Sequence, residues 1–507
     1  MEIPAFIQRS PFASVVVIAL ALRLIAVFTA PGYLMVDDQF LVVEPAASWA
    51  SGADHNNWLP WNMEGDKKPH AANFSYVGTQ YFVFEALNAI GMEDPKAQMV
   101  VVRLLHALYS LLIVVLGFKI TERLGNERTA TYVGLFLAAA AIMPNFSVRQ
   151  LVEIVCIPPM LLATWAIVRT DGKPQLHDFL LAGLGIGLAT GLRYQAGVFG
   201  IGFGLVLLFQ RQFKGAVVTG VFALVIFALT QIQDVFIWGK PFTQLLAYIG
   251  YNESHSSSYP NGPWYMYLLT LLGYLVPPLS VFLLYGFFAS VRRYPLVVIP
   301  ALAFLVFHSV FPNKQERFIF PIIPFVVIAG ILFWDGWMSR SAFWQQRRGL
   351  WRGIVTAFLV INFAGLAVLT TTYGKRSRVE SMYTLYQAGD LENFIAVYTK
   401  SEPLPPRFYS GQWERNYWCR GETDPQVQLE LMCGAREHRK LPNYLLIYGG
   451  GDVEGTFARF APVFGLDAPF AVVEPGFLDR ILHRLNPNNN TLETVYIYRC
   501  APDALCD

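Results

Sequence analysis

Charged side chains are scarce in this sequence, and their scarcity excludes an ordinary soluble protein. Asp, Glu, Lys and Arg make up 15% of the 507 residues, whereas hydrophobic residues make up 54%. A soluble domain carries about 25% charged residues. The formal net charge is +2 and no basic stripe runs along the chain, so we expect no nucleic-acid partner.

Three signatures of other protein classes are also missing. The histidines show no HxxxH or HExxH spacing, so no metal site is predicted. The Gly449–Gly451 turn lacks the lysine and the helix of a nucleotide-phosphate loop, so no cofactor is evident. No internal repeat is visible, although repeats are common among secondary transporters. We therefore expect neither a bound nucleotide nor a transporter fold built from repeats.

Long apolar runs dominate the chain instead. They recur in segments of about 20 residues, the length that crosses the ~30 Å hydrocarbon core of a bilayer. The candidate spans are 12–30, 98–118, 128–143, 150–169, 177–191, 194–210, 214–231, 264–290, 295–311, 318–337 and 350–372. We therefore predict a polytopic α-helical membrane protein with about 11 spans. The first run is interpreted as a retained span, with a cleaved signal peptide as the alternative.

The basic residues orient these spans. If the N-terminus is cytoplasmic, every inside link is short and basic, as the positive-inside bias requires. The long links 31–97 and 232–263 then lie outside, and we expect them to be ordered, with interfacial helices in the first. The outer compartment is the periplasm of a bacterium or the lumen of the endoplasmic reticulum.

The composition changes after Tyr373. Residues 373–507 mix polar and apolar positions, with strand-like runs at 444–448, 470–473 and 495–498. We therefore divide the chain into a membrane domain, 1–372, and a small soluble α/β domain on the outer side, 373–507. Four of the five cysteines lie in this second domain, and an oxidising compartment favours disulfides. The pairs nearest in sequence are Cys419–Cys433 and Cys500–Cys506.

Ionisable residues at the outer ends of the spans are candidates for chemistry. Asp37 and Asp38 follow the first span, and a carboxylate there can accept a proton from an attacking hydroxyl. The alternative is an ordinary solvated acid. Cations on the outer side oppose the positive-inside bias and could bind a phosphate, the alternative being anchoring to lipid head groups. These cations are Arg149, Arg193, Lys314 and Arg317.

A further group lies in the second long outer link and after it. Its aromatic side chains could stack on sugar rings or belong to the interfacial aromatic belt. The candidates for acceptor or sugar binding are Asp234, Trp238, Asn252, His255 and Trp264.

Four stretches, in order along the chain, carry a resemblance to a known family. They are VDDQFLVVEPAASWASG (36–52), Arg149 with Glu153, the block 233–267, and NKQERF (313–318). They resemble the motifs of the dolichyl-phosphate-mannose-dependent α-mannosyltransferases of lipid-linked oligosaccharide and GPI-anchor assembly. That family belongs to the membrane-embedded GT-C glycosyltransferases. The likeness extends over residues 12 to about 337, although Asn313 and Gln315 replace the usual His and Glu. These departures from the eukaryotic motifs favour a bacterial inner membrane with the site facing the periplasm, the alternative being the membrane of the endoplasmic reticulum.

The resemblance implies a function and roles for the residues. The donor would be a polyprenyl- or dolichyl-phosphate sugar, most simply mannose, and the acceptor a lipid-linked glycan or glycolipid in contact with membrane lipids. The four outer cations would bind the donor phosphate, and Asp37 or Asp38 would be the base of an inverting one-step displacement. Glu44 and Glu153 would join the acceptor- or sugar-binding group. The alternatives are a transporter or flippase of lipid-linked sugars, and a GT-C transferase acting on protein or another envelope lipid.

Overall fold

The computed structural model describes residues 4–255, 258, 261–400, 404–487, 490–501 and 506. Its contacts divide the chain into two compact units. The first, called the helical unit, comprises Met1–Phe28, Trp58–Gly78 and Val102–Thr371. The second, called the mixed unit, comprises Thr29–Asn57, Thr79–Val101 and Thr372–Asp507. The mixed unit thus combines the C-terminal segment with two stretches of the first long link.

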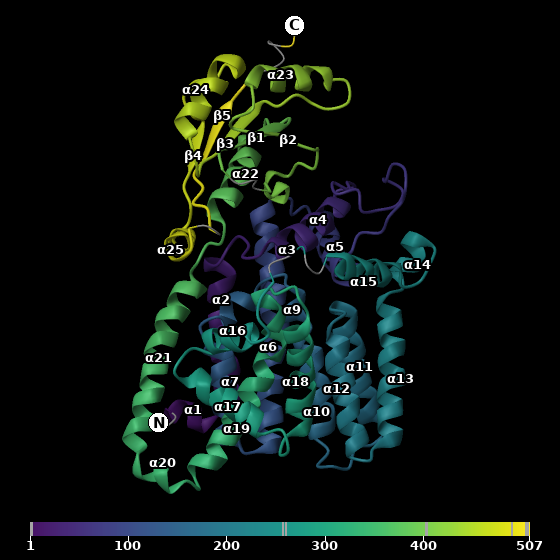
Figure 1. The fold of residues 1–507 in the computed structure, drawn as a ribbon, viewed down its shortest axis with the longest axis vertical. Coiled ribbons are helices and arrows are strands. Elements are labelled where there is room, and N and C mark those ends of the chain that lie inside the picture. The colour runs from purple at the N-terminus through teal and green to yellow at the C-terminus, as the bar shows by residue number, and fades with distance from the viewer. Residues whose placement is uncertain are drawn as a thin grey trace. The chain divides into compact units, whose positions relative to one another are not determined.

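Apolar helices build the helical unit (Figure 1). The principal ones are α2 (Pro11–Thr29), α6 (Pro95–Leu124), α7 (Glu127–Ala139), α10 (Ile157–Val168), α11 (Leu176–Leu192), α12 (Ala196–Phe209), α13 (Phe213–Thr230), α16 (Met266–Tyr274), α17 (Leu279–Ala289), α18 (Pro295–Val310), α19 (Ile323–Met338) and α21 (Arg348–Thr370). Every predicted span falls on one of these helices or on consecutive helices, which confirms a polytopic helical protein.

Five helical segments are long and apolar enough to cross a membrane: Pro11–Thr29, Pro95–Leu124, Phe213–Thr230, Glu316–Met338 and Arg348–Thr370. Shorter apolar helices accompany them, so the count of eleven spans stays a prediction. The predicted span 264–290 is two helices, because Pro277 and Pro278 have no N–H to continue α16 into α17.

Glycines bring α11 into close contact with α13. A Cβ added to Gly187 would lie 2.6 Å from the carbonyl oxygen of Ala223, and one on Gly183 would lie 2.8 Å from that of Thr219. Small residues four apart let helix backbones approach closely within a membrane, where no hydrophobic effect drives helices together. The spacing of these glycines therefore explains why α11 and α13 pack tightly.

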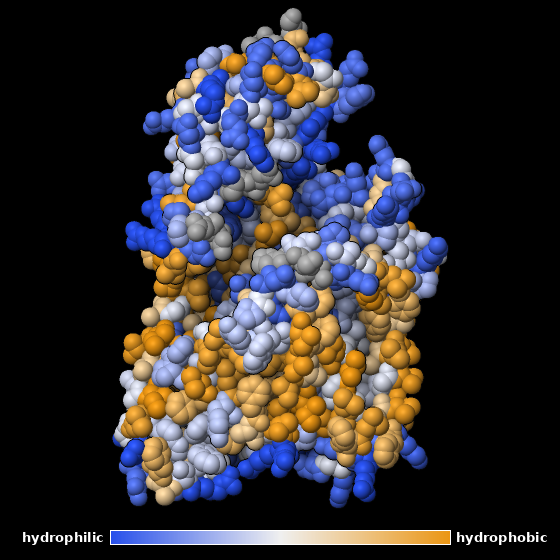
Figure 2. All heavy atoms as spheres, viewed as in Figure 1, coloured by the Kyte–Doolittle hydropathy of each residue, from blue (hydrophilic) through white to orange (hydrophobic). Residues whose placement is uncertain are grey.

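The outer flank of these helices is apolar. Figure 2 shows hydrophobic atoms covering the helices, with hydrophilic atoms at their lower ends. On α13 the side chains of Val217, Val221, Leu224 and Leu229 are exposed. A solvent-exposed row of this kind would be unfavourable in water, so this face is suited to lipid.

The mixed unit contains a five-stranded sheet of order β2-β1-β3-β5-β4. Strands β2, β1 and β3 are parallel, and β5 is antiparallel to both β3 and β4. The strands are β1 (Phe394–Tyr398), β2 (Tyr417–Arg420), β3 (Tyr444–Tyr448), β4 (Ala471–Val473) and β5 (Val495–Arg499). The helical segments are α3 (Val36–Asp38), the π-helical turn η1 (Gln39–Val43), α4 (Glu44–Ala50), α22 (Arg376–Ala388), η3 (Arg407–Ser410), α23 (Pro425–Gly434), α24 (Val453–Phe464) and α25 (Phe477–Leu485), while α5 (Phe74–Ala89) contributes to both units.

The core of this sheet confirms an α/β fold. Every residue of β1 and of β3 is buried, as expected for central strands covered on both faces. Phe460 and Phe464 of α24 pack in the same core as Leu429 and Met432 of α23. The three strands predicted from the sequence are present as β3, β4 and β5.

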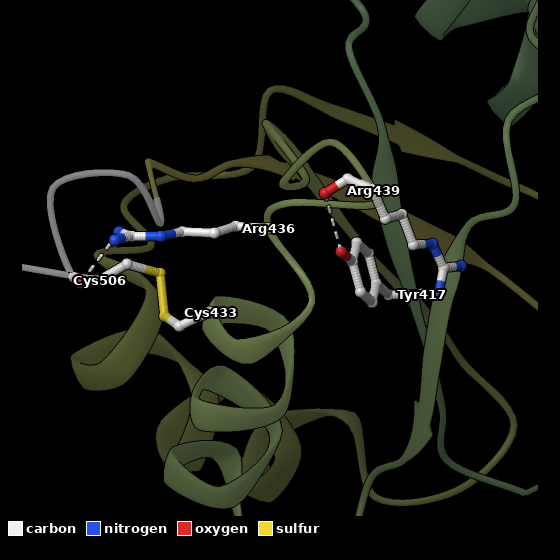
Figure 3. The surroundings of a disulfide bond; sticks show 5 residues. All are labelled: Tyr417, Cys433, Arg436, Arg439 and Cys506. Atoms are coloured by element: carbon white, nitrogen blue, oxygen red, sulfur yellow. Dashed lines mark hydrogen bonds between the residues drawn. A yellow bond between two sulfur atoms is a disulfide. The ribbon is translucent and has the colours of Figure 1, made fainter.

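One disulfide joins Cys433 to Cys506, with 5.5 Å between their Cα atoms (Figure 3). The predicted pairs Cys419–Cys433 and Cys500–Cys506 are therefore wrong. Cys419 on β2 and Cys500 after β5 are buried in the sheet core and are not bonded to another cysteine among the described residues. Proximity in sequence failed because the sheet carries these two thiols inward, whereas Cys433 ends α23 beside the C-terminal segment.

Candidate active site

Two buried arginines of the helical unit share one buried carboxylate. Glu153 lies on the short helix α9 (Val152–Val155) and forms an ion pair with Arg317, with 3.4 Å between Oε1 of Glu153 and Nε of Arg317. Arg193 Nη2 lies 3.7 Å from the same oxygen. All three residues are at most 8% exposed. Two guanidinium groups beside one carboxylate leave an excess of one formal positive charge, which favours an anion at this place.

Arg193 is the residue with capacity left for a ligand. It ends α11, and its Nη1 donates a hydrogen bond to the carbonyl oxygen of Phe318 at 3.0 Å. Its guanidinium also lies over the rings of Phe304 and Phe318. Nη2 is buried and has no hydrogen-bond partner within the part of the chain that the structure describes. An unsatisfied buried donor on a cation is costly unless an acceptor occupies the site.

The three charged residues come from elements that are distant in sequence. Arg317 lies in the 3₁₀-helix η2 (Glu316–Ile322), which packs against α9. A 3₁₀ turn forms here because Pro321 and Pro324 interrupt the hydrogen bonding of a regular helix start. The turn between α18 and α19 therefore carries Arg317 to Glu153.

Lys314 is engaged in holding that same turn. Its Nζ donates to the carbonyl oxygens of His308 and Ser309, each at 2.8 Å, and to that of Phe311. An ammonium group has three protons, so all of them are used at the C-terminus of α18. Burial lowers the pKa of Lys314. The expected direct contact of Lys314 with a phosphate would require it to release one of these carbonyls.

Two tyrosines complete the surroundings, and sequence reasoning missed both. Tyr248 on α15 (Thr243–His255) accepts a hydrogen bond from Gln195 Nε2. Burial raises the pKa of Tyr248, and the nearby charge of Arg193 opposes that shift. Tyr267 on α16 accepts the backbone N–H of Gln315 at 3.3 Å. The tyrosine-rich block 233–267 was the available signal, but it did not distinguish these two rings from the aromatic belt.

Asp234 has a structural position within the second long link. It is completely buried on α14 (Gln233–Trp238), and its Oδ2 accepts the backbone N–H of Gln244 at 2.9 Å, near the start of α15. Burial raises its pKa. Trp238 donates its indole N–H to the Gln244 side chain when the amide of Gln244 faces the carbonyls of His70 and Ala72. Both predicted residues therefore shape the link.

The remaining candidates of this block do not converge on the arginines. Asn252 donates to the carbonyl oxygen of Tyr248 at 2.8 Å, His255 stacks on Tyr251, and Trp264 is 67% exposed. Residues 256, 257, 259 and 260 of the block 233–267 lie outside the described residues.

Arg149, the fourth predicted phosphate-binding cation, is buried and donates from Nε to the side-chain oxygen of Asn145 at 3.0 Å.

The predicted base candidates belong to the mixed unit. Asp38 is buried and its Oδ2 accepts the backbone N–H of Leu34 at 3.3 Å, whereas Asp37 is half-buried. Both end α3, directly before the π-helical turn η1. Such turns are rare and often occur at functional sites.

Glu44 is a structural acceptor within the mixed unit. Its two oxygens lie 3.1 and 3.2 Å from the backbone N–H of Phe408, and Oε1 also accepts from Gln39 Nε2 at 2.8 Å. Burial raises the pKa of Glu44 to about 7, against which these hydrogen bonds act. His55 Nε2 lies 3.9 Å away, and burial lowers the pKa of His55 to about 3. Glu44 therefore holds η3 in place.

Comparisons with known proteins point to one family. The model of the Alg9-like mannosyltransferase family matches residues 14–397. GPI mannosyltransferase 3 of Yarrowia lipolytica is 25% identical over 357 residues, and GPI alpha-1,2-mannosyltransferase 3 of Mus musculus is 24% identical over 162. These alignments cover 69% and 31% of this chain. The chain spans 66% and 27% of the length of the two relatives, less than two thirds in each case.

Solved structures share the fold. ArnT from Cupriavidus metallidurans bound to undecaprenyl phosphate superposes with a TM-score of 0.59 at 14% identity, covering 97% of this chain and 98% of that one. The oligosaccharyltransferase of Archaeoglobus fulgidus gives 0.55 at 12% identity, covering 87% and 68%. At these identities the likeness shows the fold, which is that of the GT-C glycosyltransferases. With the family model matching most of its length, the chain belongs to the Alg9-like mannosyltransferase family.

Proposed function

We propose that this chain is a membrane mannosyltransferase that takes mannose from a polyprenyl- or dolichyl-phosphate donor and adds it to a lipid-linked glycan or a similar acceptor. Family membership supports the reaction class. The observation that carries the proposal is the buried Arg193 Nη2, which has no hydrogen-bond partner among the described residues and adjoins a second arginine. A donor phosphate oxygen would satisfy it.

The arginines would act on the leaving group. The acceptor oxygen forms a bond to C1 of the sugar while the bond from C1 to the donor phosphate oxygen breaks. Negative charge then grows on the departing lipid phosphate, and guanidinium groups fixed in a desolvated site stabilise it. Arg193 and Arg317 take this role, Glu153 orients both of them, and Lys314 holds the turn that carries Arg317.

The proton of the acceptor hydroxyl needs a base, and we assign it to Asp37 or Asp38. Asp38 is the more buried of the two, and its carboxylate accepts the backbone N–H of Leu34. Asp37 is only half-buried, so it is the more accessible of the two to solvent. Replacing each by Asn separates them.

The proposed location is the bacterial inner membrane with the site facing the periplasm, the alternative being the endoplasmic reticulum with the site facing the lumen. The disulfide between Cys433 and Cys506 supports an oxidising outer compartment in either case. If the protein transfers no sugar, the alternative interpretation is a transporter of lipid-linked sugars.

The test is transfer of radiolabelled mannose from polyprenyl-phosphate-mannose to extracted membrane lipids and glycans by the protein in nanodiscs. Arg193→Ala and Arg317→Ala should each lower the rate by about 10²–10³-fold, as expected for lost transition-state donors. Asp37→Asn or Asp38→Asn, whichever removes the base, should lower it by about 10²–10⁴-fold. Arg292→Ala, at an exposed arginine of a predicted inside link, is the matched control and should transfer at the normal rate. Full activity in Arg193→Ala would overturn the phosphate assignment.

A further inference from the structure

The mixed unit contains a cavity of about 350 Å³ that none of the proposed catalytic residues lines. This volume is within the range of about 300–1,000 Å³ typical of small-molecule sites. Four aromatic side chains contribute to its wall: Phe84 of α5, Tyr386 of α22, Phe408 of η3, and Trp413. The rings of Phe84 and Phe408 pack on each other at 5.3 Å between centroids.

Polar side chains line the same cavity as these rings. Ser51, Asn88, Glu93 and Gln98 also line the cavity. The Gln98 amide donates to Asn88 Oδ1 at 2.7 Å, which fixes both side chains at the wall. Hydroxyl, amide and carboxylate groups exchange hydrogen bonds with sugar hydroxyls, while aromatic faces pack against the C–H face of a sugar ring.

The composition of the wall excludes two other ligand classes. No Leu, Ile, Val or Met lines this cavity among the described residues, which disfavours an acyl chain. No Lys or Arg lines it there either, and Glu93 is the charged member, which disfavours a phosphate. By contrast, a cavity of the helical unit, about 610 Å³, is lined by Lys67 and Lys240 beside Trp61 and Trp238. The cavity of the mixed unit therefore fits an uncharged saccharide.

Contacts with neighbouring residues of the mixed unit fix the aromatic side chains of this wall. Glu44 accepts the backbone N–H of Phe408 with both oxygens, and the His55 ring lies 5.2 Å from that of Trp413. Gly411 has φ +67°, and a Cβ there would come within 3.1 Å of the Tyr386 ring. A wall fixed in this way loses little side-chain entropy when a ligand binds.

We propose that this cavity is a subsite for uncharged sugar residues of the acceptor glycan. The assignment of its ligand to the acceptor rests on the proposed function, whereas the binding of a neutral saccharide does not. In this arrangement Glu44 and His55 are positioning residues, and Trp413 and Tyr386 contact the sugar.

The experiment measures binding of α-linked mannobiose and mannotriose to the full-length protein in nanodiscs by saturation-transfer NMR. Trp413→Ala and Tyr386→Ala should weaken binding by at least about tenfold, as expected when a stacking partner is lost. Trp413→Phe should restore most of it, which distinguishes stacking from a folding defect. Trp418→Ala, at a 52% exposed tryptophan on β2 of the same unit, is the matched control and should bind normally.

Transfer assays separate this inference from the proposed function. Trp413→Ala should raise the acceptor KM by about tenfold or more with little change in kcat, because only ground-state binding is removed. Arg193→Gln should abolish transfer and leave mannotriose binding intact. If the natural protein binds mannotriose and Trp413→Ala does not, the subsite is supported. If, in addition, neither the natural protein nor any variant transfers mannose, the proposed function is overturned while the subsite stands. Absence of mannotriose binding, or equal binding by Trp413→Ala, would overturn the subsite.

Discussion

At the scale of single residues, the outer cations divide into two roles that their side-chain chemistry explains. A guanidinium has five N–H donors, so Arg193 donates from Nη1 to the Phe318 carbonyl, while Nη2 lies 3.7 Å from Glu153 without a hydrogen bond among the described residues and can donate to a ligand. An ammonium has three donors, and Lys314 uses all of them on carbonyls. The sequence predicted these cations as one phosphate-binding group, but it could not divide them, because the division depends on which carbonyls lie within reach.

Glu44 provides a prediction about pH. Its pKa is about 7 in the folded protein, above the ordinary value of 4.5, so the folded state binds more protons than the unfolded state between these values. Its contribution therefore makes stability fall as pH rises from about 4.5 to about 7, by on the order of 2–3 kcal/mol. Glu44→Gln keeps an oxygen acceptor for Phe408 and removes the titration. Thermal midpoints at pH 5 and pH 8 should differ less in Glu44→Gln than in the natural protein, and an equal difference would contradict the shift.

At the scale of elements, the long periodic features were predictable and the short ones were not. The apolar runs located every principal helix because a span needs about 20 residues, and such a signal is strong. The strands β1 and β2 were missed, since a buried run as short as FIAVY (394–398) has no alternation to distinguish it from a helix segment. Strand β2, YWCR, follows an irregular stretch and has two exposed positions.

The glycines of α11 provide a prediction at this scale. Gly187→Ala would place a methyl group 2.6 Å from the backbone oxygen of Ala223, so α11 and α13 must separate. We expect a loss of about 1–3 kcal/mol, as for overpacking of a core, measured as a lower thermal midpoint in detergent. Gly220→Ala on α13, where nothing lies within 4 Å of the added methyl group, is the control and should not lower the midpoint. Equal behaviour of the two variants would refute the close packing.

At the scale of the whole molecule, the sequence indicated a membrane part followed by a soluble part. The resemblance added the family, and the family model confirms it. What the sequence could not indicate is that residues 29–57 and 79–101 contribute to the same compact unit as the C-terminal segment. The contacts responsible, such as Lys96 with Glu380 at 2.8 Å, join residues with no pattern in common.

The disulfide provides a prediction at this scale. Cys433 and Cys506 close a loop of 73 residues, and opening such a loop by Cys433→Ser should destabilise the mixed unit by about 4 kcal/mol. Peptide mapping without reductant should recover the Cys433–Cys506 crosslink, while Cys419 and Cys500 react with an alkylating agent only after denaturation. A crosslink from Cys433 to Cys419 would contradict the connectivity.

The composite build of the mixed unit has a consequence for how the protein is made. Glu44 and its partner Phe408 are 364 residues apart in the chain. At about 5–20 residues per second, a ribosome needs roughly 20–70 s to synthesise the sequence between them. During that interval the carboxylate of Glu44 lacks the backbone N–H that it accepts in the folded protein. Biosynthesis therefore calls for chaperone protection of this loop, and a nascent chain truncated before Phe408 would leave Glu44 without its partner.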